Sequence, residues 1–90
     1  MYNLEQTGRF KKDVKLAKKR GLNMQLLDTI VTSLVIKGKL SPINKPHLLK
    51  GNYMGLWECH IQPDWLLVWE QNETIKLITL LRTGTHSDLF

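Results

Sequence analysis

The spacing of the apolar residues changes partway along the chain, and this change limits the folds that the chain can adopt. Phe10, Val14 and Ala17 recur at helical spacing, as does a broader apolar set between Leu26 and Val35. From Trp57 onward, apolar and polar residues alternate instead, which is typical of half-buried strands. Helices that precede a run of antiparallel strands indicate an α+β fold, with the helices packed on one face of the sheet.

Capping residues mark the ends of the predicted helices. Thr7 can cap a helix over residues 8–20, while Asn23 and Gly38 bound a second one. The short connection between the helices predicts an antiparallel hairpin. A short N-terminal strand is predicted over residues 2–6. The other strands are predicted at 47–49, 57–62, 65–70 and 75–82.

The 90 residues suffice for one domain, residues 1–90, and the lone Cys59 allows no internal disulfide. No apolar stretch approaches the ~20 residues that span a bilayer, and no basic N-terminus precedes an apolar run. We therefore expect a cytoplasmic protein that does not bind membranes. The net charge of +5 predicts attraction to a polyanion.

Most of the positive charge lies in one segment, where Asp13 is the only acid. The basic residues of this segment are Arg9, Lys11, Lys12, Lys15, Lys18, Lys19 and Arg20. A solvated helix face and a surface that binds a polyanion or an acidic partner fit this run about equally well.

Imidazole, carboxylate, guanidinium and indole groups gather near the predicted strand ends. RNA carries its own nucleophile, so a protein that cuts it must accept the 2′-hydroxyl proton, protonate the 5′ oxygen and stabilise the added charge. Histidines, an arginine and an aromatic ring can do this without a metal. The residues concerned are His60, Asp64, Trp65, Arg82 and His86.

Each of these residues also has a structural interpretation. Glu58 and His60 share the strand face opposite Cys59, so His60 can simply face solvent and Arg82 can pair with Glu58. Trp65 lies beside a turn and suits the core and a ligand contact about equally. His47, in a loop, is the least determined.

A zinc site is the main alternative chemistry, because three histidines and an aspartate can bind zinc. The chain contains no His-Glu-x-x-His and no Cys-x-x-Cys motif, and it has no phosphate-binding glycine loop. We therefore expect neither a metal nor a cofactor.

Three segments resemble one known family, the YafQ-type branch of the RelE/ParE toxin superfamily. They are residues 47–51 (HLLKG), 55–67 (GLWECHIQPDWLL) and 81–90 (LRTGTHSDLF). With the lysine-rich first helix, the resemblance spans essentially the whole chain. It implies a RelE-like α+β fold and a ribosome-dependent endonuclease of messenger RNA. It also implies a cognate antitoxin, usually DinJ-like with a ribbon-helix-helix domain, through which the pair reaches operator DNA.

The resemblance also assigns site residues. The catalytic positions of the family fall on His47, His60, Asp64, Arg82 and His86, and its substrate contacts on Trp65 and Phe90. We expect His86 to protonate the 5′ oxygen and Arg82 to hold the scissile phosphate. We expect His60 or His47, tuned by Asp64, to take the 2′-hydroxyl proton, although the acid and base can be exchanged. The substrate-facing cations of the first helix are expected to be Lys11, Lys12 and Lys15.

Two other functions remain open. Some toxins on the same scaffold bind gyrase and cut no RNA, and a non-catalytic RNA-binding domain would also explain the charge. The His, Asp and Arg set favours a nuclease, because a gyrase binder has no evident need for it. A cleft that relies on the ribosome to bend the messenger predicts weak cleavage of naked RNA.

Overall fold

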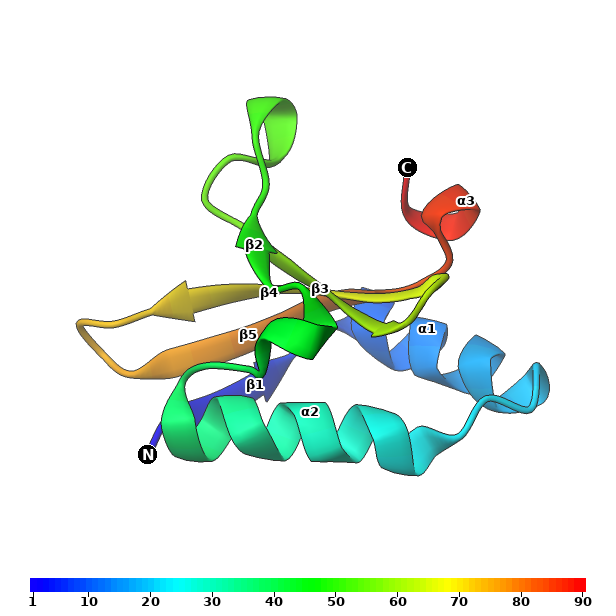
Figure 1. Cartoon of the computed structure of the whole chain (residues 1–90), viewed down its shortest axis with the longest axis horizontal. Coiled ribbons are helices and arrows are strands. Elements are labelled where there is room, and N and C mark those ends of the chain that lie inside the picture. Colours follow the sequence, from blue (N-terminus) through cyan, green and yellow to red (C-terminus); the bar gives the residue numbers. More distant parts are fainter.

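The computed structural model describes all of residues 1–90 and shows two helices beneath a five-stranded sheet (Figure 1). The opposite face of the sheet carries the loop that follows strand β2 and the short C-terminal helix α3 (Figure 1). This arrangement confirms the predicted α+β class, with the helices on one face. It leaves the other face partly open.

The two long helices begin and end where their capping residues predict. Helix α1 spans Gly8–Lys19, and the Thr7 side chain caps it by accepting a hydrogen bond from the Phe10 N–H at 3.0 Å. Helix α2 spans Met24–Lys37 and returns in the opposite direction (Figure 1). It ends at Gly38, whose φ of 69° favours glycine. Neither helix has the length and hydropathy needed to cross a membrane.

The sheet is mixed, with the strand order β1-β5-β4-β3-β2. Its strands are β1 (Asn3–Gln6), β2 (His47–Leu48), β3 (Trp57–Gln62), β4 (Trp65–Asn72) and β5 (Leu77–Gly84). Strands β2 to β5 pair antiparallel, whereas β1 runs parallel to β5. No tight hairpin joins β1 to β5, so the turn geometry that forces antiparallel pairing is absent from this pair.

Three short helical turns lie outside the predicted elements. The 3₁₀ turns are η1 (Pro42–Asn44) and η2 (Gly51–Tyr53), on either side of β2. Helix α3 (His86–Leu89) follows β5, and Thr85 caps it in a reciprocal capping box with Asp88.

The core lies between the helices and the sheet face that they cover. Strand β4 contributes Trp65, Leu67 and Trp69, and these side chains contact apolar residues of both helices. The helical residues of this cluster are Phe10, Ala17, Leu27, Ile30 and Leu34. Cys59 is fully buried here, and burial raises the pKa of its thiol to about 12. This thiol therefore packs as a small apolar side chain and is not a nucleophile.

Helix α1 also covers part of the outer edge of β5. Strand β1 pairs only with the first half of β5, up to Leu80. Beyond that point the Thr7 side chain donates to the Leu81 carbonyl, and the Asp13 carboxylate accepts from the Thr83 N–H, each at 3.1 Å. These contacts satisfy edge groups of the strand that no other strand pairs.

Candidate active site

Two rows of paired residues cross the open face of the sheet. The first row consists of His47, Glu58, Val68 and Arg82. The second row consists of His60, Leu66 and Gly84. Residues two apart on a strand point to the same side, so Glu58 and His60 are neighbours on this face. Pairing across four strands thus gathers residues that lie far apart in the sequence.

His60 and His86 face each other at the end of the second row, with ring centroids 5.9 Å apart. Nδ1 of His86 lies 2.7 Å from the Asp64 carboxylate, and Nδ1 of His60 lies 3.3 Å from the carbonyl of Pro63. Both Nδ1 atoms therefore have an acceptor partner. This leaves the Nε2 atom of each imidazole for proton transfer.

Asp64 holds His86 through two hydrogen bonds, since the His86 backbone N–H also donates to the carboxylate at 3.0 Å. The backbone bond, and then the bond to the side chain, lower the pKa of the Asp64 carboxyl. Asp64 therefore contacts His86, and no hydrogen bond joins it to His60 or His47, the two histidines that the sequence interpretation expected it to tune. The turn between β3 and β4 faces the end of β5, which places the carboxylate beside His86 instead.

His47 takes part in a separate contact at the start of the first row. Its Nε2 lies 3.3 Å from the carboxylate of Glu58, and its Nδ1 lies 2.8 Å from the Lys45 carbonyl. Glu58 is buried, with 6% of its surface exposed. The site thus contains a buried carboxylate that the sequence interpretation considered only as an ion-pair partner. The signal that identifies it is its position two residues from His60 on the same strand face.

Arg82 is anchored by Asp13 of α1 and not by Glu58. Its Nε and one terminal nitrogen donate to the two oxygens of the Asp13 carboxylate at 2.7 and 3.3 Å. These hydrogen bonds raise the pKa of the Arg82 guanidinium. The structural alternative of an Arg82–Glu58 pair is therefore wrong. Asp13 was missed as a site residue, although it is the one acid in the basic run.

A second ion pair attaches α3 to the same side of α1. The Arg20 guanidinium contacts both oxygens of Asp88 at 2.6 and 3.2 Å and holds the pKa of that carboxyl well below its usual range. Asp13 and Arg20 are seven residues apart, which corresponds to the same face of a helix. Helix α1 therefore supports both the arginine and the short helix that carries His86.

The two aromatic residues assigned to the substrate differ in exposure. Trp65 is 2% exposed, and its indole N–H donates to the Thr83 hydroxyl at 2.9 Å. A base cannot stack on this ring in the present conformation, because Trp65 belongs to the core cluster. Phe90 is 55% exposed and meets Tyr53 edge-to-face, with ring centroids 5.2 Å apart.

The lysines of the first helix lie apart from the histidines. Lys11, Lys12 and Lys15 are exposed, and none forms an ion pair. They project from the solvent side of α1, and Asp13 and Arg20 project from the side that faces β5 and α3. The structure therefore does not bring these lysines into the catalytic cluster. It leaves them available for a larger anionic surface.

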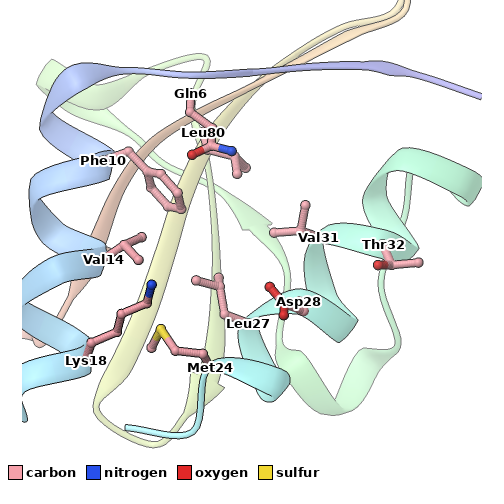
Figure 2. Close-up of a pocket in the computed structure, with 10 residues that line it drawn as sticks. All are labelled: Gln6, Phe10, Val14, Lys18, Met24, Leu27, Asp28, Val31, Thr32 and Leu80. Atoms are coloured by element: carbon pink, nitrogen blue, oxygen red, sulfur yellow. The ribbon is translucent and has the colours of Figure 1, made fainter. Parts of the chain in front are cut away.

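A groove of about 530 Å³ lies on the other side of the molecule, between α1 and α2 (Figure 2). Its lining is mainly apolar and includes Phe10, Val14, Leu27 and Val31. Lys18 and Asp28 are its only charged residues, and it has no histidine or arginine. The groove therefore lacks an acid–base pair, and the candidate active site is the cluster on the open face.

Comparisons with known proteins agree on the family. The family model for "Bacterial toxin of type II toxin-antitoxin system, YafQ" matches residues 2–90. The mRNA interferase toxin YafQ of Escherichia coli strain K12 is 38% identical over 89 residues, which cover 98% of this chain and 95% of that protein.

Solved structures give the same result. In the E. coli DinJ-YafQ complex, the matching chain has a TM-score of 0.91 and 37% identity, over 100% of this chain and 99% of that chain. A metal-bound toxin from Helicobacter pylori has a TM-score of 0.91 and 38% identity over 100% of both chains. The chain therefore belongs to the YafQ family of bacterial toxins of type II toxin–antitoxin systems.

Proposed function

We propose that the chain is a toxin that cuts messenger RNA by attack of a 2′-hydroxyl on the adjacent phosphodiester. The observation that supports this most directly is the pair of imidazoles, His60 and His86, with ring centroids 5.9 Å apart and both Nδ1 atoms held by acceptors. Such a pair can flank one phosphodiester as base and acid. The similar E. coli protein is named an mRNA interferase.

His60 is the proposed general base. Its Nε2 takes the proton of the 2′-hydroxyl, while the Pro63 carbonyl keeps the ring oriented through Nδ1. The 2′ oxygen then forms a bond to phosphorus. Glu58, two residues before His60 on the same strand face, is buried and pairs with His47.

His86 is the proposed general acid. The Asp64 carboxylate holds the ring through Nδ1, and the proton on Nε2 passes to the departing 5′ oxygen. The bond from phosphorus to the 5′ oxygen breaks, leaving a 2′,3′-cyclic phosphate and a 5′-hydroxyl. Arg82 stabilises the extra charge on the phosphorane oxygens with the donors that Asp13 does not occupy.

The reaction is proposed to depend on the ribosome. The side chains of His86 and Asp64 are 56% and 66% exposed, so the free protein does little to enclose the reacting groups. A ribosome that bends the messenger into an in-line geometry would supply the missing positioning. We therefore expect weak cleavage of naked RNA by the isolated chain.

A cognate antitoxin is the proposed protein partner. A similar toxin is known in the E. coli DinJ-YafQ complex. We propose a DinJ-like antitoxin with a ribbon-helix-helix domain, which would connect this toxin to operator DNA. The unpaired lysines of α1 would face its acidic residues, and the same surface would dock on ribosomal RNA when the toxin is free.

Induced expression tests the proposal. We expect growth arrest and new in-frame messenger 5′ ends with the natural sequence, and neither with His86→Ala or Arg82→Ala. Asp28→Asn, at an exposed position in the groove between α1 and α2, is the control and should behave like the natural sequence.

If all variants stop growth and no cuts appear, the toxin acts by binding another target such as gyrase. If His86→Ala keeps its affinity for RNA and loses no cellular effect, the chain is a non-catalytic RNA-binding domain.

A further inference from the structure

A pocket of about 370 Å³ opens on the sheet face that carries the candidate active site. Its apolar lining consists of Leu56, Val68, Leu81 and Leu89. The rest of the lining consists of the rings of Tyr53 and Phe90, the side chains of Arg9 and Arg82, and Thr7. The pocket thus combines an apolar interior, two aromatic rings and two cations.

Both aromatic side chains of the pocket are exposed to solvent. Tyr53 is 45% exposed and Phe90 is 55% exposed, although they contact each other edge-to-face. They come from separate elements, the η2 turn and the C-terminus, which stand on the same side of the sheet (Figure 1). An edge-to-face pair leaves ring faces free, and a planar ligand can stack on such a face.

The two cations identify the class of ligand. Arg9 is exposed and forms no ion pair, and Arg82 retains donors beyond those that Asp13 occupies. A nucleotide combines a flat apolar base with a phosphate, and this pocket offers a partner for each part. An apolar peptide side chain would fill the interior but would leave both guanidinium groups without an anion.

We propose that this pocket binds one nucleobase of the RNA substrate, beside the scissile phosphate, and that Tyr53 contacts this base and sets its preference. The inference rests on the proposed nuclease function and names a subsite of the same site. Arg82 links the pocket to the candidate active site, because it lines the pocket and lies in the row that contains Glu58. Phe90 provides a second link between the pocket and the site, since its backbone N–H donates to the His86 carbonyl at 2.9 Å.

Base recognition in this pocket would therefore position the chemistry. A base stacked on a free face of the Tyr53–Phe90 pair places its phosphate at Arg82, within the group that includes His86. Binding the preferred base would then orient the backbone for in-line attack. Removal of the Tyr53 ring should weaken binding and also relax the choice of base at one codon position, which a purely structural role would not do.

Two measurements on four proteins test the inference. The proteins are the natural chain, Tyr53→Ala, Tyr53→Phe and Met54→Ala, the last an exposed neighbour on the same loop that does not line the pocket. The first measurement is the affinity of the folded chain for a 2′-deoxy trinucleotide, which lacks the nucleophile, from NMR chemical-shift changes. The second is the base preference of ribosomal cleavage, from mapped 5′ ends.

We expect Tyr53→Ala to bind the trinucleotide about 10-fold more weakly and to cut with a relaxed base preference. Tyr53→Phe keeps the ring and should match the natural chain, as should Met54→Ala. Unchanged affinity and preference in Tyr53→Ala would overturn the inference. It would also be overturned if Tyr53→Ala lost only antitoxin binding. Tyr53-dependent binding without any cleavage by the natural chain would overturn the nuclease proposal and leave the nucleobase site standing.

Discussion

Asp64 accepts two hydrogen bonds from His86, one from the imidazole Nδ1 at 2.7 Å and one from the backbone N–H at 3.0 Å. The pair joins the β3–β4 turn to the first residue of α3. The carboxylate, whose pKa is lowered by these bonds, stays ionised at neutral pH and orients the ring. A carboxylate that holds an imidazole through Nδ1 fixes the orientation of the ring and leaves Nε2 for the proton that a general acid donates.

Asp64→Asn should therefore lower the cleavage rate without unfolding the chain. We expect a loss of about 10- to 100-fold, smaller than the roughly 10²- to 10⁴-fold loss for His86→Ala, because the imidazole itself remains. Single-turnover cleavage on ribosomes as a function of pH measures both effects. The matched control is Asp28→Asn, at an exposed position on α2. An Asp64→Asn variant with the natural rate and pH profile would contradict the assignment.

Acid should release α3 from α1. Arg20 holds the pKa of Asp88 below the usual value of about 3.9, so their contact stabilises the folded chain fully above that pH. The stabilisation is lost progressively as the pH falls towards the lower pKa of the folded state. The protection factors of the amides of residues 86–90, taken relative to the intrinsic exchange rate at each pH, should therefore fall only below about pH 4. In Arg20→Gln they should already be lower at pH 7, and equal protection in both proteins at pH 7 would count against the contact.

Asp13→Asn should weaken both the fold and the site. The carboxylate is only 11% exposed, and it accepts hydrogen bonds from the Arg82 side chain and from the Thr83 N–H. We expect the free energy of unfolding to fall by about 1–3 kcal/mol, as measured by urea denaturation. Cleavage by the folded variant should fall as well, because Arg82 loses its anchor. Full activity in folded Asp13→Asn would show that Arg82 needs no such support.

The sequence predicted the parts of the fold that depend on local chemistry. The caps at Thr7 and Gly38 each reflect one residue's conformational preference, and the structure confirms them. The half-buried alternation was predicted less well, because Glu58 is buried as well as Cys59, and β4 is buried on both faces from Trp65 to Trp69. The parallel pairing of β1 was not predicted. It depends on contacts across more than seventy positions, which no local pattern encodes.

In the candidate site too, the features set by local pattern were predicted and those set by long-range packing were not. Strand alternation placed Glu58 and His60 on one face, and the structure agrees. The partners of the charged groups were harder to predict, because Arg82 has both Asp13 and Glu58 as potential acceptors and only the packing of α1 on the edge of β5 selects between them. The burial of Trp65 also depends on packing, since a strand's first residue can belong to either environment.

Chelation should leave cleavage unchanged. No three His, Cys, Asp or Glu side chains converge as metal ligands in this chain, and the proposed acid and base are both imidazoles. Added Zn²⁺ should inhibit, because it competes with protons for imidazole nitrogens. Cleavage on ribosomes with magnesium retained, in the presence of a zinc-selective chelator or of micromolar Zn²⁺, measures both effects. A relative is known as a metal-bound toxin, so loss of activity on zinc removal would indicate a catalytic metal instead.

The lysines of α1 should control docking and not catalysis. Five exposed lysines occupy this helix, away from the histidines: Lys11, Lys12, Lys15, Lys18 and Lys19. Replacing all five with glutamine should weaken binding to the ribosome and to the antitoxin, and it should flatten the dependence of both affinities on salt, because fewer counterions are released. The cleavage rate at saturating ribosome concentration should stay unchanged.

The control is a double variant, Lys37→Gln with Lys39→Gln, at two exposed lysines outside α1. If both affinities of the five-fold variant equal those of the control at physiological salt, the shared docking surface is disproved. If only the ribosome affinity falls, the antitoxin silences the toxin through another surface.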